Sequence, residues 1–255
     1  MGWNITGPEE LEDAVLKLKL KLAHKIGVCA GMTVVDMGCG QGGFTASLAL
    51  TVGKKGKVLA VDVSDEYLAE LLNRVNKYGV KDVVTFIQAN AVNLKNVLLD
   101  ESADVVASYR FLEELRQPKA MPVIVKEMAR IVKESGKIGI IELCTEPKNE
   151  AEEAYIRLHR ESGDSLFEPL EIIEAMKAAK FANIHVEKVE TDIWFSPSLA
   201  KQDLSHAQVW FDAGVEKSLG KLIDKYGMKY PAFLTFSGVK NRHKFITQST
   251  HSVNR

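Results

Sequence analysis

The sequence predicts an α/β fold, in which helices cover both faces of a mainly parallel sheet. Short apolar runs rich in β-branched residues alternate with helical stretches between residues 33 and 143, which is typical of βαβ units. The first of these runs ends in a cluster of glycines, and a helix follows directly. A chain of 255 residues with 46% hydrophobic content is long and apolar enough for a sizeable core.

The elements can be assigned in order along the chain. Acidic residues in a first turn, followed by apolar residues at spacings of three and four, predict an N-terminal helix over 9–26. Apolar runs predict strands at 33–37, 57–63, 83–88, 104–108, 137–143, 185–193 and 232–239. Helical periodicity predicts helices at 44–52, 65–78, 122–134, 149–160, 169–180 and 215–226, whereas 195–214 has no clear period.

Composition excludes several classes of protein. The 33 basic and 34 acidic residues leave a net charge of −1, which gives no overall attraction to nucleic acid or anionic membranes. No apolar run reaches the roughly 18 residues that cross a bilayer, and the N-terminus does not resemble a signal peptide. The three cysteines are too few and too scattered for a disulfide framework or a zinc site. We therefore expect a cytoplasmic protein with no membrane span and no metal.

The strongest motif is the glycine loop after the first strand, Val34-Val35-Asp36-Met37-Gly38-Cys39-Gly40-Gln41-Gly42-Gly43. Glycines at this point let the chain turn sharply and let a ligand approach the backbone. The spacing also satisfies G-x-G-x-x-G, which leaves a dinucleotide site open. However, Asp36 lies within the strand, where its carboxylate would repel a pyrophosphate and would suit a ligand that carries an amino group. Asp62 follows Gly43 by nineteen residues and is positioned to accept ribose hydroxyls.

These motifs resemble those of the class I S-adenosylmethionine-dependent methyltransferases. The glycine loop resembles the first motif of the family, and residues 61–64 (Val-Asp-Val-Ser) resemble the second. Residues 88–91 (Gln-Ala-Asn-Ala), 104–108 and 136–142 resemble the later motifs in the same order. The likeness covers residues 30–145 and implies a Rossmann-like seven-stranded sheet, mainly parallel, with an antiparallel last strand. It implies one domain over 1–240 with lid-like insertions at 149–166 and 194–230, and a polar tail over 241–255.

The resemblance also implies S-adenosyl-L-methionine as the cofactor and suggests a role for each matching residue. Asp36 would lie near the amino acid end of the cofactor, and Gly38, Cys39 and Gly40 would contact its methionine part through the backbone. Asp62 would bind the ribose, Val63 would pack on the adenine, and Ser108 would lie beside the sulfonium. Asn90, which replaces the usual Asp, and Ala91 would bond the adenine ring. For Asn90 a plain loop cap remains an equal alternative.

The catalytic residues are not identified by the sequence. Methyl transfer from a sulfonium requires mainly that the nucleophile, methyl group and sulfur are held in line, so no particular acid–base pair is demanded. The candidates are Tyr109 and Arg110, which follow the fourth strand, and His206 as a base. Arg110 either holds a substrate carboxylate or pairs with Glu113. The aromatic residues of the two insertions either cage a substrate or form the core of a lid.

We therefore predict an enzyme that transfers a methyl group to an oxygen, nitrogen or carbon of a small molecule, similar in its motifs to the quinone and small-metabolite branch. A small-molecule acceptor is the expected partner, nucleic acid is not expected, and a homodimer is left open. The alternatives are a protein or tRNA methyltransferase aided by the basic tail, a non-catalytic S-adenosylmethionine-binding protein, and a nicotinamide oxidoreductase.

Overall fold

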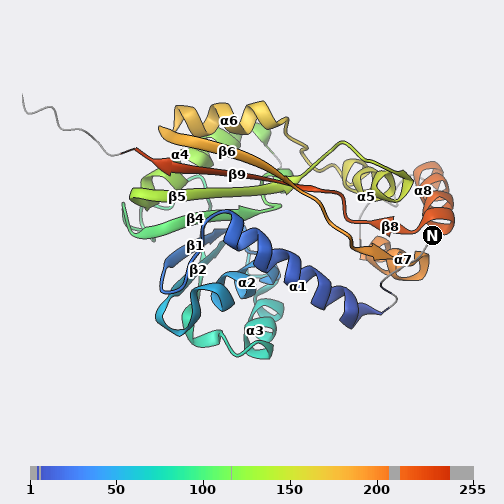
Figure 1. Cartoon of the computed structure of the whole chain (residues 1–255), viewed down its shortest axis with the longest axis horizontal. Coiled ribbons are helices and arrows are strands. Elements are labelled where there is room, and N and C mark those ends of the chain that lie inside the picture. The colour runs from blue at the N-terminus through green and yellow to red at the C-terminus, as the bar shows by residue number, and fades with distance from the viewer. Residues whose placement is uncertain (1–4, 6, 116, 207–212, 242–255) are drawn as a thin grey trace, which may run out of the picture.

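The computed structural model describes residues 5, 7–115, 117–206 and 213–241, and these form a seven-stranded sheet with helices around it (Figure 1). The strand order is β3-β2-β1-β4-β5-β9-β6. The strands are β1 (Thr33–Met37), β2 (Lys57–Asp62), β3 (Val84–Gln88), β4 (Ala103–Tyr109), β5 (Val132–Leu143), β6 (Phe181–Val189) and β9 (Phe233–Lys240). The last strand, β9, is antiparallel to β5 and β6, and the other neighbours in the sheet are parallel. The predicted sheet is confirmed.

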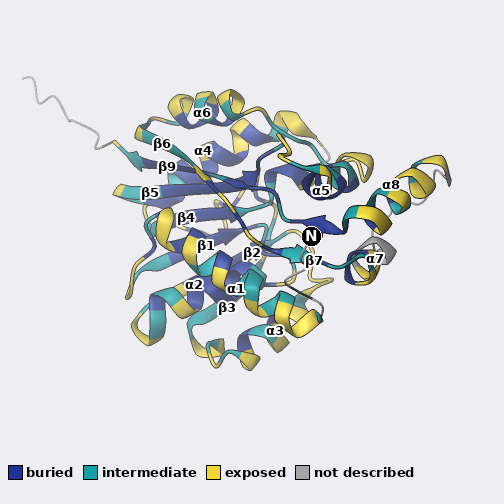
Figure 2. Ribbon diagram, turned by 45° about the vertical axis from the view of Figure 1, so that its right-hand side comes forward, coloured by how far each residue is buried: buried dark blue, intermediate teal, exposed yellow. Residues whose placement is uncertain are grey.

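Helices cover both faces of the sheet, because successive side chains of a strand point to opposite faces. One face carries α1 (Pro8–Lys25), α2 (Gly43–Val52) and α3 (Leu68–Lys77), and the other carries α4 (Met121–Ile131) and α6 (Pro169–Ala178) (Figure 1). Within β1, Val34 belongs to the core beneath α1 and α2, whereas Val35 belongs to the core beneath α4 and α6. Both valines are fully buried, and Figure 2 shows that the central strands are buried along most of their length.

A group of smaller elements lies beyond the carboxyl ends of the parallel strands (Figure 1). We call it the cap. It consists of α5 (Glu150–Glu161), α7 (Pro197–His206), α8 (Ala213–Tyr226) and the antiparallel pair β7 (Trp194–Phe195) and β8 (Met228–Lys229). The helix α7 was not predicted. Its segment is mostly polar, and Leu199 and Ala200 are buried in it. Two adjacent apolar residues do not produce a recognisable helical period.

Several element boundaries differ from those predicted. The helix α6 ends at Ala178, two residues early, because Lys180 adopts a left-handed conformation (φ 68°) and ends the helical run. The strand β6 begins at Phe181, four residues before the predicted start, and the Phe181 side chain is buried in the core. The helix α3 starts at Leu68 instead of residue 65, since a turn from Asp65 to Leu68 comes first.

The topology positions a site at the carboxyl edge of the sheet. The strand order reverses between β1 and β4, and in open α/β sheets ligands bind at such a switch point. The glycine loop leaves β1 there, and residues 109–114 leave β4 beside it. Within the described part of the chain, no helix has the length and apolar character that a bilayer span requires.

Candidate functional site

The glycine loop turns from β1 into α2 through three glycines with positive φ. A Cβ atom on Gly38 would lie 2.1 Å from Cδ2 of Phe111, and one on Gly42 would lie 2.6 Å from Cγ of Leu71. These two glycines are required by close packing. Gly40 differs, because a Cβ there would meet no atom of the described residues within 4 Å. Gly40 (φ 44°) therefore faces open space at the carboxyl edge of β1, which is the position where the backbone would receive a ligand.

The loop is fixed to the end of β2 by its own N–H groups. The N–H groups of Gly38 and Cys39 both donate to the carbonyl oxygen of Val61, at 2.9 and 3.0 Å. The N–H of Gly40 donates to Oδ2 of Asp62 at 2.9 Å. The first three N–H groups of the loop thus already have acceptors within the protein. A ligand that contacts Gly38, Cys39 or Gly40 through the backbone would meet mainly carbonyl oxygens and Cα hydrogens.

Cys39 has a buried side chain, which packs with Ala46, Ala60, Leu71 and Val75 beneath α3. Burial raises the pKa of its thiol, so the group stays neutral and does not act as a nucleophile. Cys39 is thus a small, packed residue of a tight loop.

Asp36 lies beneath the loop and is almost completely buried. The hydroxyl of Thr45, in the first turn of α2, donates to its Oδ2 at 2.6 Å. Burial raises the pKa of Asp36 to about 7, although the Thr45 hydrogen bond and the nearby Lys19 work in the opposite direction. A cationic group arriving above the loop would stabilise the ionised carboxylate.

The predicted adenosine end lies at the neighbouring strands β2 and β3. Asp62 ends β2, and its Oδ1 accepts the N–H of Ser64 at 3.1 Å. Val63 is 66% exposed, which is unusual for a valine next to a buried strand and leaves an apolar surface available. Asn90 follows β3 and caps its own loop, since its Oδ1 accepts the N–H of Val92 at 3.1 Å. Ala91, the next residue, is buried.

The end of β4 brings Ser108 and Tyr109 to the other side of the glycine loop. The Ser108 hydroxyl is completely buried and has no hydrogen-bond partner among the described residues. The Tyr109 ring stacks between Phe44 and Phe233, with centroid distances of 5.3 and 5.5 Å. The ammonium of Lys19 lies 4.8 Å from the centroid of the Tyr109 ring. Burial raises the pKa of Tyr109, so its hydroxyl is protonated at neutral pH.

Arg110 joins β4 to the cap, at a backbone position with positive φ (52°). Its Nε donates to Oε1 of Glu113 at 2.6 Å, and its Nη1 donates to the Tyr155 hydroxyl at 2.7 Å. Its Nη2 lies 3.1 Å from the His159 ring nitrogens, and Nδ1 of His159 lies 2.7 Å from Oδ2 of Asp164. Of the two interpretations of Arg110, pairing with Glu113 is thus the arrangement observed. Glu113, His159 and Asp164 are spaced like metal ligands, but the guanidinium already supplies a positive charge there.

The aromatic residues of the cap mostly pack against one another. The Tyr155 ring contacts the rings of His159, Phe195 and Tyr230, with centroid distances of 4.7, 6.5 and 4.8 Å. Tyr155 and Phe195 are buried. These rings form the core of the cap, and only Tyr230 also lines the cavity described next. Of the third catalytic candidate, His206, the structure describes only the backbone, at the end of α7.

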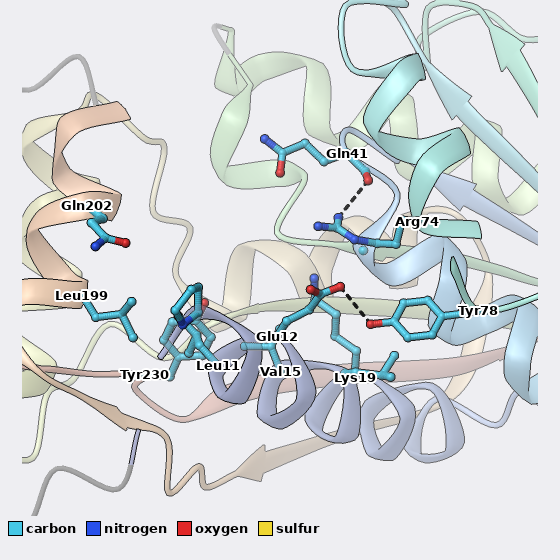
Figure 3. A pocket seen from close by; sticks show the side chains of 13 residues that line it. Leu11, Glu12, Val15, Lys19, Gln41, Arg74, Tyr78, Leu199, Gln202 and Tyr230 are labelled. Carbon is cyan, nitrogen blue, oxygen red and sulfur yellow. Dashed lines mark hydrogen bonds between the residues drawn. The ribbon is translucent and has the colours of Figure 1, made fainter. Parts of the chain in front are cut away.

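A cavity of about 350 Å³ opens beside the glycine loop, between α1, α3 and the cap (Figure 3). Its inner end is polar and is formed by the loop, the middle of α1 and α3, whereas its outer end is largely apolar. The lining residues are Pro8, Leu11, Glu12, Val15, Leu16, Lys19, Gln41, Gly43, Arg74, Tyr78, Leu199, Gln202 and Tyr230. Neither Tyr109 nor Arg110 belongs to this lining.

Lys19 and Arg74 line the cavity beside the glycine loop, and sequence reasoning did not identify either of them. Lys19 is one of several lysines on the first helix, and only the packing of α1 against α2 distinguishes it. Loss of hydration, followed by the nearby Arg74 and Arg110, lowers the pKa of Lys19 to about 7, whereas Asp36 works in the opposite direction. The sequence offered one indirect signal. Lys19 lies between Leu18 and Leu22, which are both buried, so its side chain begins beside the core and must extend past it to place the ammonium in a polar environment.

Comparisons with known proteins agree with this geometry. A family model described as a methyltransferase domain matches residues 29–197. A sterol 24-C-methyltransferase of Gibberella zeae is 28% identical over 211 residues, which are 78% of this chain and 53% of that protein. A ubiquinone/menaquinone biosynthesis C-methyltransferase of Salmonella arizonae is 31% identical over 133 residues, which are 51% of each chain. The chain spans about half the length of these curated relatives.

Solved structures share the fold. A cyclopropane-fatty-acyl-phospholipid synthase-like protein of Lactobacillus casei superposes with a TM-score of 0.71 at 17% identity, over 90% of this chain and 92% of that one. A SAM-dependent methyltransferase of Aquifex aeolicus gives a TM-score of 0.57 at 21% identity, over 91% and 93% of the two chains. Since the family model matches more than half of the sequence, the chain belongs to the methyltransferase domain family, within the class I S-adenosylmethionine-dependent methyltransferases.

Proposed function

We propose that this protein transfers a methyl group from S-adenosylmethionine to an oxygen, nitrogen or carbon of a small molecule. The observation that carries the proposal is the open backbone at Gly40, which donates its N–H to Asp62 at the end of β2 and precedes Gln41 in the cavity lining. The cofactor would supply an electrophilic methyl group on a positively charged sulfur. The protein would supply binding, orientation and exclusion of water.

The residues present fit this cofactor. Asp62 places a carboxylate at the loop, and the ammonium and sulfonium of the ligand would stabilise the ionised form of Asp36, whose pKa burial raises to about 7. A pyrophosphate would be repelled by the same acids. Asp62 would accept the ribose hydroxyls, because a carboxylate that receives two backbone N–H groups still has lone pairs to offer. The exposed Val63 would pack on the adenine, with Asn90 and Ala91 at its edge.

The methionine part would lie over Gly38, Cys39 and Gly40, toward β4. The buried hydroxyl of Ser108 has no hydrogen-bond partner in the described part of the chain. A buried hydroxyl without a partner destabilises the fold, unless a ligand or a water molecule forms the hydrogen bond. Tyr109 is fixed by two stacked rings, so it would form a rigid wall there. Arg110 would be a positioning residue, because its guanidinium links the end of β4 to Tyr155 and His159 of α5 in the cap.

The acceptor would occupy the cavity that leads from the loop to the cap. Its volume of about 350 Å³ lies at the small end of the range for ligand pockets. Its outer end is largely apolar and is lined by Leu11, Val15, Leu199 and the ring of Tyr230 (Figure 3). An apolar or ring-bearing acceptor agrees with relatives whose names specify a sterol and quinones. On this basis the small-molecule branch is favoured over a protein or tRNA substrate.

Titration calorimetry followed by a methyl-transfer assay tests the proposal. The protein should bind S-adenosylmethionine and S-adenosylhomocysteine and should not bind NADH at the same concentrations. Radiolabelled S-adenosylmethionine should then transfer its methyl group to a member of a panel of apolar phenols, quinols and prenyl compounds. Binding of NADH without binding of either sulfur ligand would contradict the proposal. Binding without transfer to any compound class would favour the non-catalytic alternative.

A further inference from the structure

The inner end of the cavity is formed by two cations from different helices. Lys19 comes from α1 and Arg74 from α3, and both reach the first residue of α2, Gly43. A Cβ atom on Gly43 would lie 2.4 Å from Nζ of Lys19 and 3.3 Å from Nη1 of Arg74. The two side chains therefore converge on one point above the glycine loop, as Figure 3 also shows.

Neither cation forms an ion pair with a carboxylate of the residues that the structure describes. Within the described ranges, the Lys19 ammonium makes no hydrogen bond or ion pair, and it lies over the face of the Tyr109 ring. Arg74 donates from Nη1 to the carbonyl oxygen of Gln41 at 2.9 Å, which leaves most of its N–H groups for other acceptors.

The nearest acids are already engaged. Glu12 lines the same cavity, but it accepts from Nζ of Lys77 at 2.8 Å and from the hydroxyl of Tyr78 at 2.9 Å. Asp36 is buried beneath the loop and is bonded by Thr45. Burial lowers the pKa of Lys19 most, Arg74 and Arg110 lower it further, and Asp36 raises it only in part, which agrees with a positive charge that lacks a counterion.

Two converging cations at the inner end of a cavity favour an anionic group with two oxygens. Charge-assisted hydrogen bonds from an ammonium and a guanidinium to one carboxylate are strong and directional. The methionyl group of the cofactor carries one such carboxylate. Since the methionyl group is proposed to lie over this loop, its carboxylate is the anion that can reach Gly43.

We propose that Lys19 and Arg74 bind the carboxylate of the cofactor's methionyl group, so that the N-terminal helix is part of the cofactor site. This inference rests on the proposed function. It predicts that the protein distinguishes cofactors that carry this carboxylate from decarboxylated ones. Asp36 and the loop would serve the cationic groups of the same ligand, and the two cations would serve its anionic group.

Calorimetry with two ligands tests the inference. The ligands are S-adenosylhomocysteine and its decarboxylated analogue, which has the same sulfur, ribose and adenine. The wild-type protein should prefer the carboxylate form by roughly tenfold or more, the value of one well-made charged contact. In K19M this preference should largely disappear, because affinity for the carboxylate form falls while affinity for the decarboxylated form stays within about twofold. R74Q should reduce the preference in part.

Two further variants complete the experiment. K19R should retain the preference, because it keeps the charge at the same point. K17M is the matched control, since Lys17 lies on the exposed face of the same helix and outside the cavity lining, and it should bind both ligands as the wild type does. Melting temperatures confirm that each variant is folded.

The outcomes separate the inference from the proposed function. Unchanged affinity of K19M for S-adenosylhomocysteine, or an equal loss for both ligands, would overturn the carboxylate assignment and leave the proposed function standing. A wild-type protein that binds neither ligand would overturn both.

Discussion

Replacing Gly40 with alanine tests whether the open space above the glycine loop is the cofactor site. Gly40 has a positive φ of 44°, and an added Cβ would meet no atom within 4 Å in the part of the chain that the structure describes. The substitution keeps the backbone N–H, so the hydrogen bond to Asp62 survives. The methyl group therefore adds strain and fills space that only a ligand would use.

The effect on folding can be worked out from the backbone alone. A side chain in the left-handed region costs about 1–2 kcal/mol. For a chain of this length, a loss of 1 kcal/mol lowers the melting temperature by about 2–4 °C, so the melting temperature of G40A should fall by roughly 2–8 °C. The protein should remain folded at 25 °C.

The effect on binding should be larger. If the methionyl group lies against Gly40, the added carbon displaces it at a cost of about 1–3 kcal/mol, typical of forcing one carbon into a filled site. That corresponds to a loss of affinity of roughly 5- to 150-fold for S-adenosylhomocysteine, measured by calorimetry. Gly40→Val should abolish binding.

Gly31→Ala is the matched control. Gly31 also has a positive φ (81°) and open space around it, but it precedes β1 and lies at the opposite edge of the sheet. It should lose a similar amount of stability and bind the ligand as tightly as the wild type. If G40A binds S-adenosylhomocysteine as well as G31A does, the assignment of the loop is wrong.

Three further substitutions test other parts of the structure. Asp62→Ala should weaken binding of S-adenosylhomocysteine by about 1–3 kcal/mol, and an unchanged titration would remove the ribose role. Burial alone would raise the pKa of Glu127, but the hydrogen bonds from Arg130 and a backbone N–H lower it below the value in the unfolded chain. The ionised carboxylate therefore stabilises the folded state, and this contribution is lost as pH falls below about 4.3. Urea unfolding of Glu127→Gln should therefore vary less with pH in that range, and a slope equal to the wild type's would refute this. Arg110→Met should cost about 3–5 kcal/mol because Glu113 stays buried without its partner, and adding Glu113→Gln should recover part of that loss in thermal melts.

Much of the fold could be predicted because it depends on local patterns. The runs at residues 33–37 and 57–62 are mostly apolar, as expected of strands buried on both faces, and each carries an acid at or next to its last position (Asp36 and Asp62). Gly38 and Gly42 are required by close contacts with Phe111 and Leu71, so the packing of the loop is visible in the sequence as glycines.

The remainder of the site depends on contacts between distant segments. Lys19 and Arg74 are separated by more than fifty residues, and neither lies in a motif. Arg110 was a candidate to bind a substrate, but its partners Tyr155 and His159 come from a cap helix that periodicity could predict without predicting where it packs. Motifs read along one strand and its loop therefore do not identify residues that reach the site only because two distant helices pack together.

The hydrogen bonds of the loop decide between the two ligands that its glycines suggested. A loop that binds pyrophosphate uses its backbone N–H groups, together with a helix N-terminus, to surround the phosphate oxygens. Here the N–H groups of Gly38 and Cys39 are bonded to Val61, and that of Gly40 is bonded to the carboxylate of Asp62. A pyrophosphate would have to break these bonds and approach two acids, Asp62 and the buried Asp36. A ligand with an ammonium and a sulfonium requires neither change, because those acids attract it. The same spacing of glycines thus serves opposite charges in the two families, and the acceptors of the loop N–H groups determine which charge this chain favours.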